Sequence, residues 1–386
     1  MKTPEIGLNS LSEELHRSRL VIEKHQGTCT FIDKQPLISF SHNDYLGLSH
    51  HPKVIQAAQQ AIQDYGTSAN ASPLVAGHTR LDQSLEMQLA ERLDMPKALL
   101  FSSGTVANYA LIRCLGQNNQ PFFADKLCHA SLIDGMAQQK NKVRRFPNNK
   151  MHFPEKWIHN HNKSEQKSKP IVVTEGVFSM EGNQSDLIAL TALKKQHDYS
   201  LVVDDSHGIG VLGDAGAGTT AHFGIKADII TASLGKALAS HGGFVAGPED
   251  LIEALIQSAR PLIYSTAIPP SSAAAALAAL TLMEKKSQHQ AKCHENIAYF
   301  REQSKEKGLN ALKSQTAIQG IIISDIKQLK TVHQHLLESG FLVGMIRPPS
   351  VPKNSSRLRI CLSAAHTKKH IDALIQHTLI ALEKST

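Results

Sequence analysis

Hydrophobic residues follow two alternating patterns through the middle of the chain. Short continuous apolar runs, typical of buried β-strands, occur at 98–101, 121–125, 170–174, 201–204 and 229–232. Segments with apolar residues at helical spacing lie around and between them, at 52–65, 81–93, 131–139 and 187–197. Strands that are apolar on both faces and alternate with helices indicate a mostly parallel sheet covered on both sides. The pattern predicts an α/β fold, in which ligands bind beyond the carboxyl ends of the strands.

The two ends of the chain have other patterns. Residues 10–26 are expected to form a polar amphipathic helix, with Ser10 and Glu13 placed as a capping box, and short strands should follow at 28–32 and 37–40. The Ala-rich segment 270–290 predicts a long helix that leads into the C-terminal part. There we expect helices at 290–307, 326–339 and 367–383, and strands near 320–324 and 357–362. The predicted domains are an N-terminal arm (1–45), a large domain (46–285) and a smaller C-terminal α+β domain (286–386).

Composition is that of an ordinary globular protein. Of the 386 residues, 41% are hydrophobic and 19% are charged, which excludes general disorder. No apolar stretch reaches the roughly 18 residues of a membrane span, and the first residues have no apolar core like that of a secretory signal. The five cysteines are scattered and never form a CxxC pair, which favours reduced thiols. We therefore expect a cytoplasmic protein that does not associate with a membrane.

The formal net charge of +7 raises the question of nucleic-acid binding. We do not expect it, because the basic residues are spread along the sequence and aromatic residues make up only 5% of the chain. A mildly basic surface suits an anionic small molecule or an acidic carrier protein equally well. The histidine-rich stretch 157–163 is expected to be a solvated loop. No metal site is expected, because no carboxylate or cysteine accompanies these histidines at ligand spacing.

One lysine stands out among small residues in the segment 229–243. Lys236 is a candidate Schiff-base nucleophile, because little bulk crowds it and a planar cofactor could lie against the backbone. A surface lysine at a helix start would have a similar sequence. The segment 201–208 favours the Schiff-base lysine over the surface lysine, since a buried apolar strand there ends in Asp204, with His207 three residues later. Pyridoxal phosphate needs a lysine to hold its aldehyde and an acid to keep its ring nitrogen protonated, and both are present.

A phosphate site is indicated at 98–108. A short apolar strand turns there through two serines and Gly104 into a helix. The free N–H groups at a helix start bind phosphate, and glycine lets the anion approach closely. An ordinary helix cap has the same sequence, so this segment alone does not decide the question.

Seven motifs, in this order, resemble those of one known family. They are NDYLGL at 43–48, HASLIDG at 129–135, TEGVFSM at 174–180, DDSHG at 204–208, LGKA at 234–237, YST at 264–266 and IRPP at 346–349. From about residue 15 to the C-terminus the chain is similar to the α-oxoamine synthases, which are pyridoxal-phosphate enzymes of fold type I. The resemblance implies a fold type I aminotransferase-like structure and a homodimer with shared active sites.

The resemblance also implies how the cofactor ring is held. Lys236 would be the Schiff-base lysine and the base that removes the α-proton of the amino acid. Asp204 would pair with the pyridinium nitrogen, and His129 would stack on the ring. His207 and Ser179 would hydrogen-bond the phenolic oxygen. Without the resemblance, Asp204 or its neighbour Asp205 could equally cap a helix, and His129 could be an ordinary core histidine.

The remaining roles follow from the same resemblance. The cofactor phosphate would be bound by the backbone of Gly104 and Thr105, the Ser233 hydroxyl, and Ser265 and Thr266 of the partner subunit. The amino-acid carboxylate would be bound by Asn43 and Arg359, because a guanidinium grips a carboxylate with two hydrogen bonds. Strand alternation puts Arg357 and Arg359 on one face, where they could also be a surface ion-pair strip. The acyl substrate would contact Arg17 and Ser350, and Glu175 would support the residues beside it.

Three positions depart from the family pattern. The segment 68–74 replaces a glycine-rich loop that normally contains Ser-Arg-Leu, Thr105 replaces an aromatic residue, and Ser233 replaces threonine. Because serine keeps the hydroxyl, phosphate binding should survive. The other two changes put the acyl-chain specificity in question.

The expected reaction is a decarboxylative condensation of an amino acid with an acyl thioester. Within the family, the chain length, DDSHG and the segment IRPPSVP at 346–352 most resemble the members that use L-alanine, and this resemblance implies a pimeloyl thioester carried on coenzyme A or acyl carrier protein as the second substrate. The alternatives within the family are the 2-amino-3-ketobutyrate ligase, 5-aminolevulinate synthase, serine palmitoyltransferase and autoinducer synthase activities. A further alternative is a scaffold that binds cofactor or carrier protein without turnover.

Overall fold

The computed structural model describes residues 18–164, 168–283 and 287–385, so Arg17 lies outside it. Its centre is a seven-stranded sheet in the order β4-β10-β9-β8-β7-β5-β6. The strands are β4 (Lys97–Phe101), β5 (Phe122–Asp125), β6 (Val143–Phe146), β7 (Ile171–Glu175), β8 (Ser200–Asp204), β9 (Ile229–Ser233) and β10 (Gly243–Gly247). β10 is antiparallel to both of its neighbours, β4 and β9, and all the other pairs in this sheet are parallel. The expected α/β fold with a mostly parallel sheet is confirmed.

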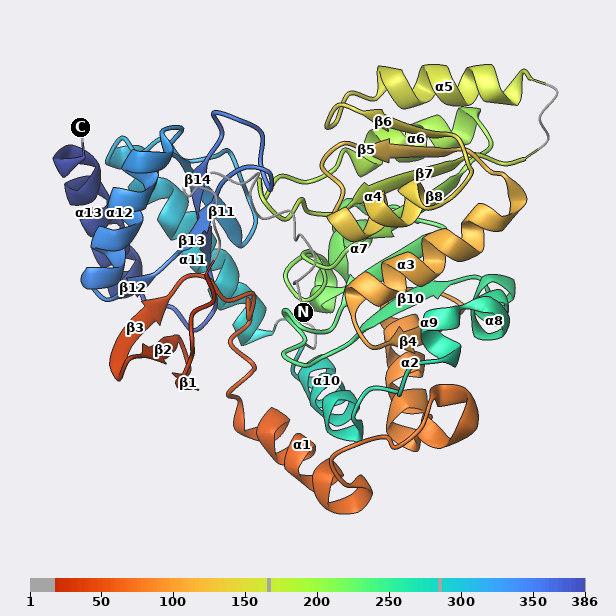
Figure 1. Ribbon diagram of the computed structural model, residues 1–386, viewed down its shortest axis with the longest axis horizontal. Coiled ribbons are helices and arrows are strands. Elements are labelled where there is room, and N and C mark those ends of the chain that lie inside the picture. The colour runs from red at the N-terminus through yellow and green to blue at the C-terminus, as the bar shows by residue number, and fades with distance from the viewer. Residues whose placement is uncertain (1–17, 165–167, 284–286, 386) are drawn as a thin grey trace, which may run out of the picture.

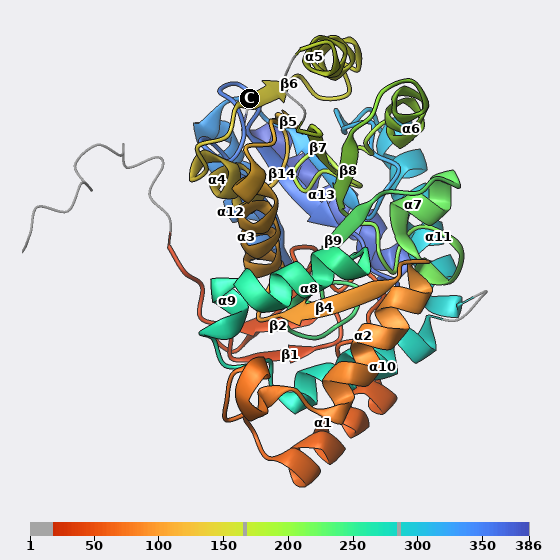
Figure 2. The same ribbon diagram turned by 90° about the vertical axis from the view of Figure 1, so that its right-hand side faces the viewer.

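Helices cover both faces of this sheet (Figures 1 and 2), because its strands are apolar on both sides. Along β8, for example, Val202 packs into one core, while Leu201 and Val203 pack into the other. The first core is closed by α3 (Gly104–Leu115), α4 (Ala130–Ala137), α8 (Glu249–Ser258) and α9 (Arg260–Ile263). The second is closed by α2 (Arg80–Arg92), α5 (His152–Asn162), α6 (Leu187–Gln196), α7 (Gly218–Phe223) and α10 (Pro270–Leu282).

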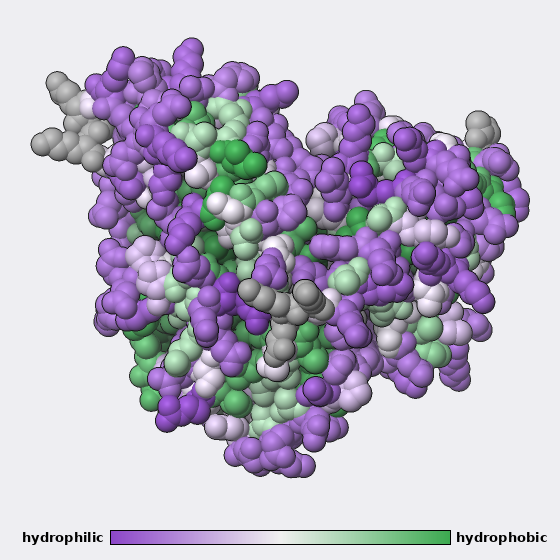
Figure 3. Space-filling model, turned by 180° about the vertical axis from the view of Figure 1, so that it is seen from behind, coloured by the Kyte–Doolittle hydropathy of each residue, from purple (hydrophilic) through white to green (hydrophobic). Residues whose placement is uncertain are grey.

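A smaller α+β part follows in the chain, and Figure 3 shows the two parts from behind, with a notch between them. Its three-stranded sheet has the order β11 (Ile318–Ile322), β14 (Arg357–Cys361) and β13 (Gly344–Ile346). Its helices are α11 (Gln288–Glu306), α12 (Ile326–Glu338) and α13 (Lys368–Lys384).

The N-terminal strands join this smaller part. A second sheet contains β1 (Lys24–Gln26), β2 (Cys29–Ile32), β3 (Gln35–Ser39) and β12 (Phe341–Leu342), and β3 pairs in parallel with β12. The chain then crosses to the large sheet through α1 (Pro52–Tyr65), which packs on α10, and a short π-helical turn (Pro73–Gly77). The crossing segment 40–48 therefore lies between the two parts.

Three local expectations are wrong. Residues 18–23 have no regular structure and 24–26 form β1, so the described end of the expected helix 10–26 is not helical. The helix expected at 270–290 ends at Leu282, where it packs on α1 and α2, and a separate helix, α11, begins at Gln288. The histidine-rich stretch 157–163 is not a loop: it is the second half of α5, which is fixed by Ile158, a fully buried residue, and by Trp157, which contacts the sheet residue Phe123.

No helix in the described part of the chain is long and apolar enough to cross a membrane.

Candidate active site

A cavity of about 230 Å³ opens at the carboxyl ends of β7, β8 and β9, where they face the first turns of α3 and α4. Parallel strands leave this edge of a sheet free for ligands. The cavity is lined by Ser103, Gly104, Thr105, Asn108, His129, Glu175, Asp204, Ser206, His207, Ser233 and Lys236. Seven residues singled out in the sequence for cofactor binding therefore meet here: Gly104, Thr105, His129, Asp204, His207, Ser233 and Lys236.

Lys236 lies in the tight connection between β9 and β10. The backbone closes this connection with hydrogen bonds from Leu234 N–H to Gly242 O (2.9 Å) and from Ala239 N–H to Lys236 O (2.9 Å). Gly243 is required here, since a Cβ at that position would stand 2.3 Å from the backbone nitrogen of Gly104. Burial lowers the pKa of the Lys236 amine, and the nearby carboxylates of Asp204 and Glu175 partly oppose the shift. A lowered pKa increases the fraction of neutral amine, the form that attacks a carbonyl.

Asp204 is held at the end of β8 by neutral donors. Its Oδ2 accepts from Asn108 Nδ2 at 2.7 Å, and its Oδ1 accepts from Ser206 N–H at 3.0 Å. The Thr231 hydroxyl donates to Asn108 Oδ1 at 2.7 Å, so the amide of Asn108 can turn only its NH₂ towards Asp204. Sequence reasoning missed Asn108 and Thr231. The signal was available, because Asn108 lies one helical turn after the glycine proposed for phosphate binding.

Asp205 is fully buried and is not among the residues that line the cavity. Its Oδ2 accepts from the backbone N–H of Thr219 in the first turn of α7 at 2.7 Å, although the N-cap residue of that helix is Ala217. Burial raises the pKa of Asp205 to about 7.

His207 is oriented by a tyrosine that the sequence analysis left without a role. Its Nδ1 lies 2.7 Å from the hydroxyl of Tyr45, which is also 3.1 Å from Asn43 Oδ1. Burial, with the positive charges of Lys236 and Arg359, lowers the pKa of His207 well below its usual range. The imidazole is therefore neutral, with Nδ1 engaged by Tyr45 and Nε2 left to meet a ligand.

His129 and Glu175 form another side of the cavity. His129 caps α4, and its Nδ1 is 2.8 Å from Ser131 Oγ, which also accepts from Asn108 Nδ2 at 2.9 Å. The histidine is thus linked to the network around Asp204. Glu175 is buried and its Oε1 has no hydrogen-bond partner within the described residues. Burial, reinforced by the charge of Asp204, raises the pKa of Glu175 well above its usual range.

The first turn of α3 provides an anion site. Ser103 caps the helix by accepting from Val106 N–H at 3.1 Å, while the first amides of a helix have no partner within it. Gly104 approaches β9 so closely that a Cβ there would stand 3.1 Å from the Cβ of Ser233. Gly104, Thr105 and Ser233 thus line one end of the cavity, where the helix dipole favours negative charge.

Asn43 and Arg359 meet between the two parts of the molecule. Arg359 Nε donates to Ser179 O at 2.7 Å, and its Nη1 and Nη2 lie 3.4 and 3.3 Å from Asn43 Oδ1. Arg357 is also buried, and its Nη1 is 3.1 Å from Glu181 Oε1. The two arginines share one face of β14, but they are not a surface ion-pair strip. Ser179 presents its carbonyl to Arg359 and is not among the residues that line the cavity.

The other predicted residues lie elsewhere. Ser350 is exposed in the turn after Arg347. Ser265 and Thr266 line a separate cavity of about 40 Å³ beside the start of α2. They therefore cannot be assigned to the first cavity of the same subunit.

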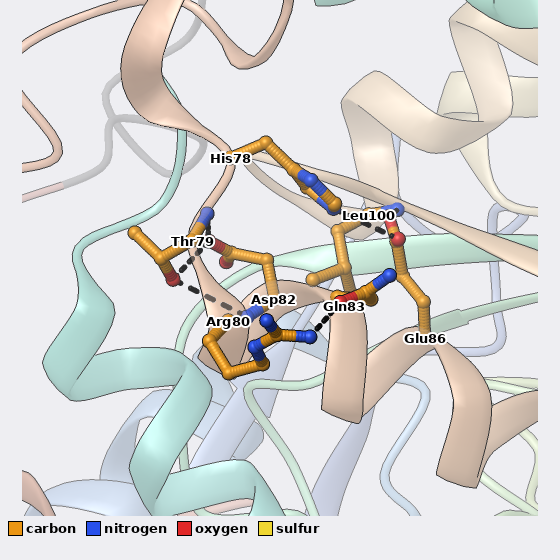
Figure 4. A network of polar contacts seen from close by, with 7 residues as sticks. All are labelled: His78, Thr79, Arg80, Asp82, Gln83, Glu86 and Leu100. Carbon is orange, nitrogen blue, oxygen red and sulfur yellow. Dashed lines mark hydrogen bonds and ion pairs between the residues drawn. The ribbon is translucent and has the colours of Figure 1, made fainter.

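Polar contacts fix the wall of this second cavity (Figure 4). Asp82 Oδ2 accepts from Thr79 N–H at 2.7 Å, and Glu86 accepts from both His78 and the N–H of Leu100. These bonds tie the loop before α2 to strand β4.

The larger cavity fits pyridoxal phosphate. Asp204 is a buried carboxylate whose hydrogen-bond donors are neutral, so a protonated ring nitrogen would supply the missing counter-charge. The anion site at α3 lies at the same cavity as the amine of Lys236, so both ends of the cofactor find partners. Among the residues the structure describes, no group of three or more His, Cys, Asp or Glu side chains could hold a metal ion.

Known proteins are similar over most of the chain. The family model for class I and II aminotransferases matches residues 35–377. Relatives named 8-amino-7-oxononanoate synthase, from Pseudomonas aeruginosa (strain LESB58) and Nitrosococcus oceani, are each 40% identical over 368 residues, or 95% of this chain and 90% and 97% of theirs.

Solved structures agree with this likeness. Serine palmitoyltransferase from S. paucimobilis, with a bound PLP–myriocin aldimine, has a TM-score of 0.90 at 26% identity, covering 95% of this chain and 93% of that one. The 8-amino-7-oxononanoate synthase from Francisella tularensis has a TM-score of 0.75 at 31% identity, covering 90% and 97%.

Proposed function

The chain belongs to the class I and II aminotransferase family, and we propose that it condenses L-alanine with a pimeloyl thioester to give 8-amino-7-oxononanoate, CO₂ and the free thiol carrier, a step of biotin biosynthesis. The observation that carries the proposal is the single cavity that joins the Lys236 amine, the Asp204 carboxylate and the anion site of α3. The shared name of relatives that are 40% identical over 95% of the chain selects alanine and pimeloyl thioester among the substrates of such a site.

Pyridoxal phosphate is the cofactor, and when bound it stabilises negative charge on the α-carbon of the amino acid. Lys236 would hold it covalently through Nζ. Asp204 would pair with its ring nitrogen, and His207 would hydrogen-bond its phenolic oxygen. His129 would lie on its ring face. The amides of Gly104 and Thr105 and the hydroxyl of Ser233 would bind its phosphate.

Lys236 then serves as the base at the α-carbon of alanine. Its lowered pKa supports this role, because a neutral amine can accept the α-proton and return a proton after CO₂ leaves. Glu175 lines the same cavity, and burial raises the pKa of its carboxyl well above the usual range. Arg359, which is already fixed by Ser179 O, would grip the alanine carboxylate together with Asn43.

Assembly completes the site in this proposal. Ser265 and Thr266 lie at a cavity separate from the cofactor cavity of their own chain, which supports a homodimer in which they bind the partner's cofactor phosphate. Arg17 and Ser350 would contact the acyl substrate. The five cysteines form no disulfide, which supports a cytoplasmic location.

A matrix of substrates tests the proposal. The cofactor-loaded protein is incubated with L-alanine, glycine, L-serine or L-threonine and with pimeloyl, acetyl, succinyl or palmitoyl thioesters, and thiol release and product mass are followed. We expect the highest kcat/KM for L-alanine with the pimeloyl donor. A higher value for L-serine with the palmitoyl donor would overturn the proposal in favour of the activity named for the structural neighbour with a TM-score of 0.90.

A further inference from the structure

The positive charge of this chain is concentrated in one segment, although the basic residues look scattered along the whole sequence. Residues 126–163 contain eight Lys and Arg and only two Asp and Glu, a net charge of +6. The rest of the chain has 33 basic and 32 acidic residues and contributes +1. Nearly the whole formal charge of +7 therefore comes from the stretch between the end of β5 and the end of α5.

This stretch forms the outer edge of the large sheet (Figure 2). β6 is the last strand and pairs only with β5 inside that sheet. Around it lie six basic residues, which we call the basic edge: Lys126, Lys140, Lys142, Arg144, Arg145 and Lys150. All are exposed except Arg144, which is half-buried over the ring of Trp157. None of the six forms an ion pair with a carboxylate among the described residues.

The basic edge is rigidly built. Asp125, at the end of β5, accepts from Asn148 Nδ2 and from Asn149 N–H, both at 3.1 Å. Asn149 is fixed in turn by its Nδ2, which donates to Gln184 O at 2.9 Å. These bonds clamp the loop after β6 to the end of β5 and to the loop that contains Gln184. The side chains on this loop and on the strand therefore project from an ordered backbone.

One end of the basic edge lies beside the cofactor cavity. Lys126 is three residues from His129, which lines the cavity, and its N–H donates to Phe146 O at 2.9 Å. At the other end, Lys142 precedes β6, and four residues of strand place it about 13 Å further along. A thioester on a phosphopantetheine arm could cross this distance while its carrier protein sat on the exposed strand.

We propose that the basic edge is the docking surface for an acidic carrier protein that delivers the acyl thioester to the cavity. The proposal rests on the proposed function and selects carrier protein over free coenzyme A as the preferred donor. Charge complementarity supports this partner, since an unpaired row of cations attracts an acidic protein and speeds its encounter. The basic edge extends along the strand and both flanking loops. This surface is longer than the phosphates of the nucleotide in coenzyme A would need. Charged residues also keep sheet edges from pairing with other chains, and this purely protective role is the alternative to be excluded.

Charge reversal distinguishes carrier docking from simple protection of the sheet edge. An acidic edge would still repel the sheet edges of other chains, but it would no longer attract an acidic carrier protein. The test variant replaces Lys126, Lys140, Lys142 and Lys150 with Glu; in the structure these side chains make no hydrogen bond or ion pair with described residues. The matched control replaces the exposed residues Lys305, Lys307, Lys327 and Lys369 with Glu and so changes the net charge equally. Binding of holo acyl carrier protein is measured by calorimetry at low and high salt. Turnover is measured with pimeloyl carrier protein, pimeloyl coenzyme A and pimeloyl pantetheine.

We expect the test variant to weaken carrier binding and raise KM for the carrier-bound donor by about tenfold or more at low salt, with a smaller effect at high salt. kcat and the kinetics with pimeloyl pantetheine should stay unchanged, and the control should behave like the wild type. Equal effects in both variants, or none in the test variant, would overturn the docking proposal. A loss of activity in the test variant that is confined to pimeloyl coenzyme A would also overturn it. Tight binding of RNA to the wild type that carrier protein does not displace would overturn it as well. Wild-type protein that uses no pimeloyl donor at all would refute the proposed function, while the binding measurement would still decide the docking surface.

Discussion

The carboxyl ends of β7, β8 and β9 and the outer edge at β6 belong to the same sheet but are built in opposite ways. At the first, polar side chains are buried and hydrogen-bonded to one another, as in the series Thr231, Asn108 and Asp204. At the second, cations such as Lys140 and Lys142 are exposed and have no acidic partners within the described residues. Buried networks fix a geometry, whereas exposed charges act at a distance and are screened by salt.

Because of this difference, single substitutions should have large effects in the cavity and small effects on the basic edge. In the cavity each group depends on its neighbours, so the loss of one atom leaves another buried group unsatisfied. On the basic edge the charges act together, and no single one is essential. The predictions below test this contrast, and their expected effects fall from the cavity to the edge.

Lys236→Ala should have the largest effect. Removal of the amine that holds the cofactor and moves the α-proton should lower kcat by about 10⁴-fold or more. The assay is thiol release with L-alanine and pimeloyl thioester, and circular dichroism controls for folding. Activity within tenfold of the wild type would show that another residue performs both roles.

Asp205→Asn should change stability with pH, because burial raises the pKa of Asp205 to about 7 from an ordinary value near 3.8. The folded protein then holds a proton that the unfolded chain releases, so the stability that Asp205 contributes is complete below about pH 4 and is lost as the pH rises through about 7. The full change amounts to about 4 kcal/mol at most, close to a thousandfold in the folding equilibrium.

Urea unfolding at acidic and alkaline pH measures this effect. The wild type should lose stability relative to Asp205→Asn as the pH rises. Parallel curves for the two proteins would contradict a neutral Asp205.

Asp204→Asn should leave the cofactor attached but slow the reaction at least about a hundredfold. The neutral amide cannot hold a proton on the ring nitrogen, so negative charge on the α-carbon is stabilised less. Stopped-flow exchange of the α-proton of alanine with solvent isolates this step. An unchanged rate of α-proton exchange would show that Asp204 does not stabilise the protonated ring nitrogen.

Thr231→Val should lower turnover about tenfold and stability by about 1 kcal/mol. Valine keeps the volume but removes the hydroxyl that orients Asn108, so the amide can turn and offer Asp204 an oxygen instead of an N–H donor. The pH profile of cofactor absorption should shift along with the rate. A loss of stability without that shift would make the residue a packing element only.

A single Lys142→Glu substitution should have the smallest effect, about a twofold rise in KM for the carrier-bound donor. Addition of Lys140→Glu should increase the effect roughly in proportion, because exposed charges that do not share partners act almost independently. A tenfold effect from Lys142→Glu alone would show that the edge contains a specific contact and not a diffuse field.

Much of the fold could be predicted from the sequence, because the central strands are apolar on both faces and stand between regular helices. The exceptions have physical reasons. β6 contains two arginines, since an edge strand exposes its side chains, and it does not show the apolar signal of a buried strand. The second half of α5 does not look helical in the sequence, because its histidines mask the few apolar residues, such as Ile158, that attach it to the sheet.

The cavity was partly predictable for a similar reason. Lys236, Asp204 and His207 belong to motifs whose residue types imply their chemistry. Asn108 and Tyr45 lie within segments that the sequence singles out, but no role could be predicted for them. The function of an amide or a hydroxyl depends on partners that are distant in sequence, such as Thr231 and His207. The concentration of charge in 126–163 could have been counted from the sequence, but only the structure places it on one edge beside the cavity.

The most direct measurement is the position of the cofactor on the chain. The protein is loaded with pyridoxal phosphate, reduced with borohydride to fix the cofactor to the amine that holds it, digested and examined by mass spectrometry. We expect the phosphopyridoxyl mass on the peptide that contains Lys236, in wild type and in Asp204→Asn alike. Label on a different lysine, or no label on any peptide, would contradict the assignment of the cavity as the active site.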